Sequence, residues 1–367
     1  MVYHMNKIIP QNQNDILIDK VALYNITVED IFDLSELEKQ DLITVEKHPQ
    51  KYLTTNSGEK FRNIEIGKCP QFDIFACGIA RNGEPYSRME LSVNGSDGLH
   101  NLNCITVENL KEKINDADRY MADDLGVLCN FDESKIKYLE MNKTFEIVLN
   151  SLEYDRVLKT MINIMPKVTS KIKKPVTATK KTYSASNKSQ TEIVKIYDKS
   201  NQLKEVHNID TNANILRFEL RLINDTNRLK TKFGSAYVRD LNENVIEKYY
   251  SEYVQNNFVT PYLKLLEFQN KKVTKILKEN YKKDDKEWID NVLHIICDYE
   301  IKNEIPLMFE IEQMKEWLNC LNLPKQNKYY IFKRFEAKSV KFNTVFKNND
   351  KAKYEEILDK IEYLYFD

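Results

Sequence analysis

The chain has 367 residues, of which 42% are hydrophobic and 30% charged, a composition typical of a soluble globular protein with two or three folding units. Its 55 basic and 56 acidic residues nearly balance, but residues 151–240 hold 18 basic and nine acidic residues, so positive charge is concentrated there. Only eight glycines occur, and neither GxGxxG nor GxxxxGK[ST] is present, which argues against a dinucleotide enzyme or a P-loop NTPase.

Three further features limit the kind of metal site and the cellular compartment: the cysteines, the histidines and the apolar runs. The six cysteines form no CxxC pair, which fits a reducing compartment and gives no indication of zinc. The five histidines are isolated, so a metal site made of two histidines adjacent in sequence is excluded. No window approaches 18 consecutive apolar residues, and no secretory signal pattern is found. We therefore expect a cytoplasmic protein that does not contact a membrane.

The first 165 residues mix strand and helix patterns. Period-two alternation predicts five strands, at Ile16–Tyr24, Phe61–Gly67, Phe72–Ala80, Ser87–Gly95 and Ile136–Leu149. Apolar residues at three- and four-residue spacing predict three helices, at Val28–Lys39, Thr106–Leu125 and Tyr154–Met165. Thr106 is the expected N-cap of the second helix.

The next segment is basic and strand-like, and the last one is helical. Lys167–Lys181 contains six lysines and one proline, directly after Pro166, and is predicted to be a connecting loop. Two strands, KTYSAS and TEIVKIY, flank the turn NKSQ and predict a hairpin, and LRFELRL (Leu216–Leu222) predicts another strand. From about Asn242 long charged segments with helical periodicity follow, with prolines near the breaks between them.

These elements predict an α+β fold. We expect a mostly antiparallel sheet with helices on one side, followed by an all-α C-terminal domain. The expected boundaries are residues 1–240 for the first domain, which could itself divide into 1–150 and 151–240, and residues 241–367 for the second.

Tyr197, in the phrase VKIYDK, is the candidate nucleophile. A tyrosine hydroxyl can attack a phosphodiester and keep the bond energy in a phosphotyrosine linkage. Its ordinary pKa is about 10, so a neighbouring cation or metal is needed to favour the phenolate. Lys195 and Lys199 flank it two residues away on either side, so in a continuous strand they would share its face. The alternative for any single tyrosine among 21 is simple packing.

Glu219, in LRFELRL, is the candidate metal ligand. Arg217, Glu219 and Arg221 would project from one side of the strand, and a carboxylate there suits a hard divalent cation such as Mg²⁺ or Mn²⁺. Glu140 is the best second ligand, because an unpaired acid is costly in a strand otherwise fit for burial. The alternative is that these residues form salt bridges on a solvent-exposed face.

The concentrated positive charge coincides with the candidate phosphate-handling site, and a polyanionic substrate such as a nucleic acid would explain both. A plain solvated face is the competing interpretation. The candidate DNA-binding residues combine the basic loop with the arginines beside Glu219; they are Lys171, Lys173, Lys174, Lys180, Lys181, Arg217 and Arg221.

Four phrases resemble the filamentous-phage and rolling-circle plasmid replication initiators: MELSVNGSDGLHNLNCITVENLKEKI, IKYLEMNKTF, IVKIYDKSNQLKE and ILRFELRLIND. The resemblance covers roughly residues 16–240. It implies that Tyr197 nicks one strand at an origin and that Glu219 and Glu140 lie near the metal. The family often has aspartate where Glu140 stands, and its Ser-Leu-Pro-Lys type phrase is here the divergent SDGLHNLN.

The resemblance also implies a course for the reaction. The nick would leave a 5′-phosphotyrosine and a 3′-hydroxyl that primes a host DNA polymerase, and a host helicase would unwind the duplex. A second nucleophile would come from another tyrosine or from the other subunit of a homodimer. Two alternatives share the fold: a conjugative relaxase with the same chemistry, and a DNA-binding protein that has lost activity.

The C-terminal run PKQNKYYIFKRF (Pro324–Phe335) is aromatic and basic. Such a run can stack on bases and contact phosphates. The simpler interpretation is a helix whose aromatic residues pack inside the C-terminal domain.

Overall fold

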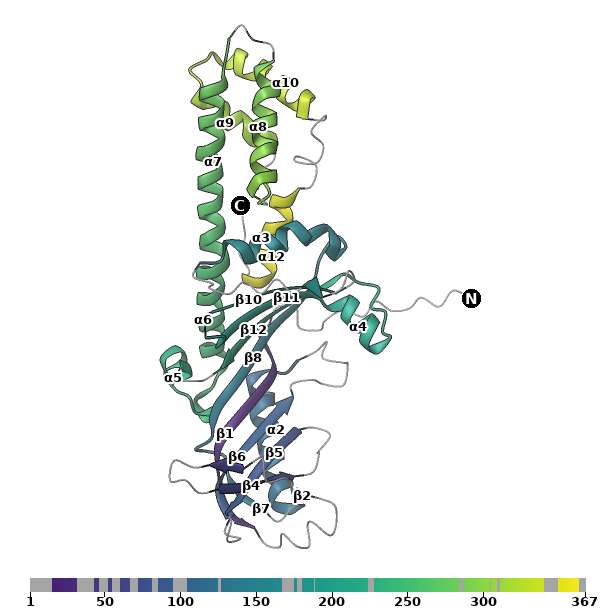
Figure 1. Ribbon diagram of the computed structural model, residues 1–367, viewed down its shortest axis with the longest axis vertical. Coiled ribbons are helices and arrows are strands. Elements are labelled where there is room, and N and C mark those ends of the chain that lie inside the picture. Colours follow the sequence, from purple (N-terminus) through teal and green to yellow (C-terminus); the bar gives the residue numbers. More distant parts are fainter. Residues whose placement is uncertain are drawn as a thin grey trace, which may run out of the picture. The chain divides into compact units, whose positions relative to one another are not determined.

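The computed structural model (Figure 1) describes most of the chain. The described residues are 15–31, 43–45, 52–54, 60–66, 72–80, 85–94, 104–124, 127–166, 175–176, 180–187, 189–223, 228–283, 285, 287–303, 305–308, 311–339 and 349–362. For the strands between residues 43 and 94, the description is limited to the backbone.

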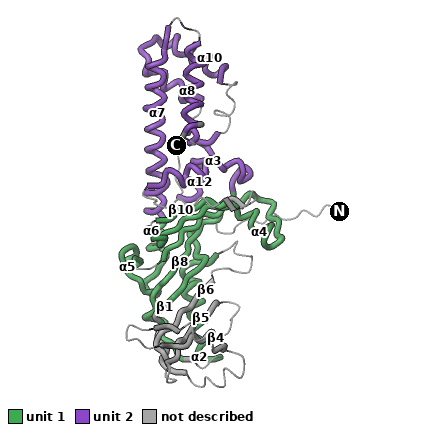
Figure 2. Tube along the Cα trace, viewed as in Figure 1, with its two compact units in different colours: residues 1–146, 172–250 green, residues 147–171, 251–367 purple. Residues whose placement is uncertain are grey.

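The chain divides into two compact units (Figure 2). The first combines residues 1–146 with 172–250, and the second combines residues 147–171 with 251–367. This division differs from the expected domain boundaries, because a short segment before residue 172 joins the C-terminal helices and the later boundary falls ten residues beyond 240.

The first unit is built on an antiparallel sheet. Its centre has the strand order β1-β8-β12-β11-β10. These strands are β1 Leu17–Ile31, β8 Lys135–Glu146, β12 Ile215–Ile223, β11 Glu192–Asp198 and β10 Lys180–Ser186. Beyond β1 the sheet continues through β6 Pro85–Asn94, β5 Phe72–Ala80, β4 Lys60–Ile66 and β2 Ile43–Val45. The remaining strands are β3 Tyr52–Thr54 against β4, β7 Val127–Asn130 against β1, and β9 Pro175–Val176 against β10.

The strand predictions are confirmed, including the β10–β11 hairpin. The predicted acidic helix at Val28–Lys39 is wrong for residues 28–31, which continue β1. Those residues form backbone pairs with β7, so the chain stays extended there. The rest of that predicted helix lies outside the described residues.

The first unit also contains helices, which lie between the strands and after the last strand in the sequence. They are α2 Val107–Asp123, α4 Lys199–His207, α5 Arg228–Phe233, the 3-10 turn Val238–Asp240 and the part of α6 (Glu243–Val254) up to Tyr250. Thr106 caps α2 as expected, since its Oγ1 accepts a hydrogen bond from the amide of Asn109 at 3.2 Å. Phe218 of β12 is fully buried and packs edge-on against Tyr250 of α6, with ring centroids 5.6 Å apart. One face of β12 is thus covered by a helix.

The second unit is helical. Its helices are α3 Asp155–Ile164, α7 Thr260–Asn280, α8 Trp288–Asn303, α9 Met314–Trp317, α10 Lys325–Ser339 and α12 Asp350–Glu362. A π-helical turn, Gln255–Val259, precedes α7, and 3-10 turns lie at Ser151–Tyr154, Ile311–Gln313 and Leu318–Cys320. The amphipathic α3 buries Val157, Leu158 and Met161 and packs on α7 and α12, which explains why it joins this unit.

The predicted α+β class, with an antiparallel sheet and a helical C-terminal region, is confirmed. Among the helices that the structure describes, none is both long and apolar enough to cross a bilayer.

Candidate active site

The register of three neighbouring strands brings the predicted site residues together. Strand β12 lies between β11 and β8. Across these strands Lys195 is opposite Glu219, Tyr197 is opposite Arg217, and Arg221 is opposite Glu140. Directly opposite residues share a face, and residues two apart in a strand share it too. All of these side chains therefore arise from one face of the sheet.

The alternating pattern of the sequence explains this placement. Between the polar residues stand Val194, Ile196, Phe218, Leu220 and Met141, all buried at 0% exposure on the opposite face. That apolar face fixes the register, because a shift of one residue would turn it towards solvent. The core thereby determines where the polar side chains meet.

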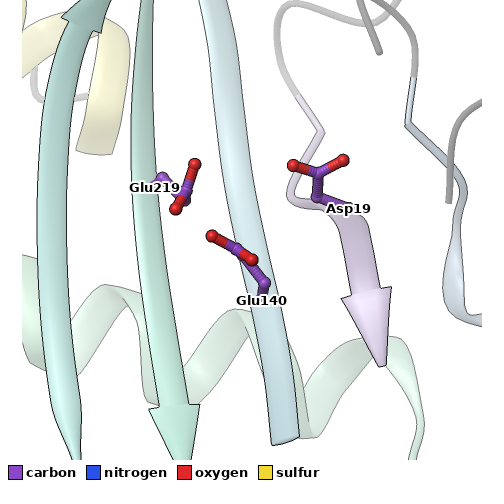
Figure 3. Close-up of side chains that lie close together, drawn as sticks. All are labelled: Asp19, Glu140 and Glu219. Carbon is purple, nitrogen blue, oxygen red and sulfur yellow. The ribbon is translucent and has the colours of Figure 1, made fainter. Parts of the chain in front are cut away.

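Three carboxylates form an acidic cluster on the polar face: Asp19, Glu140 and Glu219, from β1, β8 and β12 (Figure 3). One oxygen from each lies within 4.8 Å of the others. The register of β1 against β8 shifts between Ile18 and Lys20, so Asp19 lies at an irregularity of the strand. Such irregularities re-aim a side chain, here towards the other two acids.

The cluster fits a hard divalent cation. Mg²⁺ binds oxygen at about 2.0–2.1 Å in octahedral geometry, so its oxygen ligands are about 3 Å apart when adjacent and about 4.2 Å apart when opposite. The three carboxylate oxygens lie within 4.8 Å of one another, so side-chain movements of up to about 2 Å would bring them around one ion. All three donors are carboxylates, the type that Mg²⁺ and Mn²⁺ prefer. These residues could therefore hold such an ion.

Basic side chains neutralise the three acids. The Lys195 ammonium forms an ion pair with Glu219 and lies 3.4 Å from Glu140 Oε1. Arg221 Nη2 donates to both oxygens of Glu140, at 3.0 and 3.2 Å. Arg217 Nη1 lies 3.5 Å from Asp19 Oδ2. Lys195 consequently lies between two of the acids that would hold a metal ion.

The Tyr197 hydroxyl points to the same cluster. It donates a hydrogen bond to Glu219 Oε2 at 3.5 Å. Burial raises its pKa to about 12, although the neighbouring Arg217 opposes the shift. The other oxygen of the same carboxylate, Oε1, faces Lys195. In this arrangement the tyrosine is kept as a neutral phenol.

The position of Lys199 differs from the prediction. Strand β11 ends at Asp198, which caps helix α4 by accepting from the Asn201 amide at 2.8 Å. Lys199 is therefore the first residue of a helix and does not continue the face of Tyr197. It is buried, donates to Gln202 at 3.0 Å, and burial lowers its pKa to about 7. Its predicted catalytic role thus has no support from strand geometry.

The two arginines also differ from one another. Arg217 is fully buried, and its Nε donates to Thr144 Oγ1 at 2.8 Å. A buried side chain cannot contact a DNA backbone directly, so the structure does not support that prediction for Arg217. Arg221 is partly exposed and also lies over the ring of Tyr138, 5.0 Å from its centroid.

The basic loop cannot be placed in relation to the site. Lys171, Lys173 and Lys174 lie outside the described residues, and for Lys180 and Lys181 the description covers only the backbone of β10. Their contact with DNA stays a prediction.

The residues that sequence reasoning missed are Asp19 and its neighbours. Cys104 Sγ lies 3.7 Å from Asp19 Oδ1 and accepts from Asn142 Nδ2 at 3.1 Å, and Tyr138 donates to Glu140. Asp19 could have been found, because it interrupts the apolar run ILIDKVAL as Glu140 interrupts its own strand. The contacts of Cys104, Asn142 and Tyr138 depend on how the strands pair, which cannot be read from the sequence.

Comparisons with known proteins add little to this geometry. One solved structure that matches is that of a rolling circle replication initiator protein from Geobacillus stearothermophilus, with a TM-score of 0.34 and 12% sequence identity. The match covers 66% of this chain and 85% of that one. No family model and no curated protein matches the sequence. A structural match this distant does not identify a function for the chain.

Proposed function

We propose that this chain is a metal-dependent enzyme that nicks and rejoins one DNA strand to initiate rolling-circle replication. The observation that carries the proposal is the placement of Glu219. Its Oε2 accepts the hydrogen bond of Tyr197, while the same carboxylate belongs to the acidic cluster with Asp19 and Glu140. One side chain thus connects a candidate nucleophile with a candidate cation-binding group, the pair that metal-assisted transesterification of a phosphodiester to tyrosine uses.

The protein groups suggest how the bonds change. Tyr197 Oη would attack the scissile phosphorus, so that a tyrosine–phosphorus bond forms while the bond to the 3′ oxygen breaks. Glu219 Oε2, which already accepts from Tyr197, is placed to take the phenolic proton. The leaving 3′ oxygen takes a proton from solvent water and becomes a hydroxyl, and Glu219 releases the phenolic proton to solvent, so the protons balance. The products are a 5′-phosphotyrosine and a 3′-hydroxyl, and the reverse reaction rejoins the strand.

Asp19, Glu140 and Glu219 are the residues that would hold Mg²⁺ or Mn²⁺. When bound, the ion would stabilise the charge that develops on the phosphate and lower the pKa of the tyrosine. Lys195 would have to leave two of these acids, and its ammonium would then be available to a phosphate oxygen.

The proposed biological substrate is origin DNA. The 3′-hydroxyl would prime a host polymerase, and a host helicase would unwind the duplex because the sequence has no P-loop motif. The proposed DNA contacts are the lysines that precede or begin β10 in the sequence and the partly exposed arginine of β12: Lys171, Lys173, Lys174, Lys180, Lys181 and Arg221.

The test uses supercoiled plasmids that carry fragments of the replicon encoding the chain, incubated with protein and Mn²⁺. We expect relaxation to nicked circles and a covalent adduct whose phosphorylated peptide contains Tyr197. Tyr197→Phe should abolish both, because the substitution removes only the attacking oxygen.

Tyr183→Phe is the matched control. Tyr183 lies on the adjacent strand opposite Ile196, hence on the other face of the sheet, and the variant should nick normally. If no fragment is nicked by the wild type, or if Tyr197→Phe nicks as well as the wild type does, the proposal is wrong.

A further inference from the structure

Helix α10 presents two tyrosines to solvent. Tyr329 is 57% and Tyr330 58% exposed, and their rings meet edge to face with centroids 5.9 Å apart. Lys333 and Arg334 follow them four residues later, so they lie one turn further along the same helix face. We call these four residues the α10 face. It lies in the second unit, outside the acidic cluster.

The opposite side of α10 is anchored in the core. Phe332 and Phe335 are buried, and Phe335 packs edge-on against Trp288 of α8 with ring centroids 5.5 Å apart. Lys315 of α9 covers the ring of Phe332 at 4.5 Å. The aromatic run that the sequence singled out therefore divides into two. Its phenylalanines build the helical unit, in which α10 packs on α8 and α9 (Figure 1), and its tyrosines are left at the surface.

The charge of the helix is strongly one-sided. Within Lys325–Ser339 five basic residues accompany one acid, Glu336. Lys333 pairs with that acid at 2.6 Å, but both side chains are more than 40% exposed, so the ion pair can be exchanged for another anion at little cost. The face thus combines aromatic rings with cations that a polyanion can reach.

From this combination we propose that the α10 face binds single-stranded nucleic acid, with bases stacked on Tyr329 and Tyr330 and phosphates held by Lys333 and Arg334. Rings exposed beside cations are the pattern of sequence-tolerant single-strand binding. A docking surface for a protein would instead be expected to have an apolar centre. On α10 the two tyrosines are the exposed large apolar side chains, and their surroundings are charged or polar.

The test measures binding of a fluorescein-labelled oligothymidylate of about 20 nucleotides, long enough to cover such a site. The full chain carries Tyr197→Phe and is kept in EDTA, so that no strand is cut. Tyr329→Leu with Tyr330→Leu should weaken binding roughly tenfold or more, because leucine keeps the apolar surface but cannot stack. Lys333→Gln with Arg334→Gln should reduce the slope of log affinity against log salt by about 1.4.

Phe268→Leu is the matched control, since Phe268 of α7 is 54% exposed and should not affect binding. Photocross-linking with 5-iodouracil should label the α10 peptide, which separates this site from binding near Tyr197. The proposal would be overturned if the tyrosine variant bound the oligonucleotide as tightly as the unsubstituted α10 face does, or if only the first unit were cross-linked. It would also be overturned if the variant lost self-association in place of DNA binding.

Discussion

Replacing Lys195 by methionine should make the protein bind Mn²⁺ more tightly. The Lys195 ammonium pairs with Glu219 and lies 3.4 Å from Glu140, so an incoming ion has to displace it from both acids. A hydrogen bond between charged groups contributes about 1.5–3 kcal/mol. Removing this internal competitor should therefore lower the dissociation constant for Mn²⁺ by about 10- to 100-fold, since 1.4 kcal/mol corresponds to a factor of ten.

The affinity would be measured by titrating metal-free protein and following free Mn²⁺ by electron paramagnetic resonance. Lys204→Met is the control, because Lys204 pairs with Asp210 at 3.3 Å on an exposed surface and should not affect the site. A second measurement separates competition from simple damage. Without metal, Lys195→Met should lower the melting temperature, since Glu140 and Glu219 lose a partner, and Mn²⁺ should restore it.

The same variant should nick DNA more slowly even when saturated with Mn²⁺, because the ammonium would no longer reach the phosphate. Equal or weaker Mn²⁺ binding in a folded Lys195→Met variant would refute the competition between the lysine and the metal.

Further predictions concern three other residues. Asp19→Asn should weaken Mn²⁺ binding at least about tenfold, measured as above, because it removes one of three charged donors. Lys199→Met should raise the free energy of unfolding by on the order of 2 kcal/mol at pH 6. The gain should shrink as the pH rises above about 7. Between this pH and the ordinary pKa of lysine, Lys199 binds fewer protons in the folded protein than in the unfolded chain, so the wild type becomes more stable as the pH rises. Urea titrations at several pH values measure this change. Arg156→Met should destabilise the helical unit by about 3 kcal/mol in urea unfolding, since it leaves the buried Glu300 without its ion pair. Lys159→Met is the control: the Lys159 side chain is 51% exposed where it pairs with Asp155, so its loss should change stability by less than about 0.5 kcal/mol.

The sequence predicts most of the strands and the closeness of Tyr197, Glu219 and Glu140, and the structure confirms this placement, while the catalytic and metal-binding roles of the three residues stay predictions. Alternation of apolar and polar residues defines the buried face of β11 and β12. The polar residues of the same strands therefore lie together on the opposite face of the sheet. This alternation predicts that Tyr197 and Glu219 share a face of the sheet. The cost of an acid in an apolar strand marks Glu140, and the same cost marks Asp19 in β1.

The sequence does not show where strand β11 ends, or which basic side chain pairs with which acid. The sequence pattern puts Lys199 on the face of Tyr197 only if the strand continues past Asp198. In the structure Asp198 caps a helix, and its ability to do so competes with the extended conformation. Arg217 was predicted to contact DNA, since the residues flanking it do not reveal that Asp19 and Thr144 enclose it.

The balance of charge in the site leads to a last prediction, that metal and DNA bind cooperatively. In the described part of the site, three carboxylates face three cations, and Lys195 and Arg221 are bound to the acids that would hold the ion. A divalent ion adds two positive charges and competes with both basic side chains for the acids. The polar face should therefore attract phosphate strongly only when the metal is bound.

Because coupling between two ligands is reciprocal, DNA should raise the affinity for Mn²⁺ by the same factor by which Mn²⁺ raises the affinity for DNA. Both dissociation constants can be measured on Tyr197→Phe, which forms no adduct, with a short single strand kept in low salt. The variant should also carry Tyr329→Leu and Tyr330→Leu, so that binding to the α10 face does not mask the effect. Arg221→Met should reduce the coupling, since one of the two cations that the ion releases is then missing. Equal DNA affinity with and without Mn²⁺ would contradict this prediction. It would mean that Lys195 and Arg221 are available to DNA in the metal-free protein and are not held by their ion pairs with the acids.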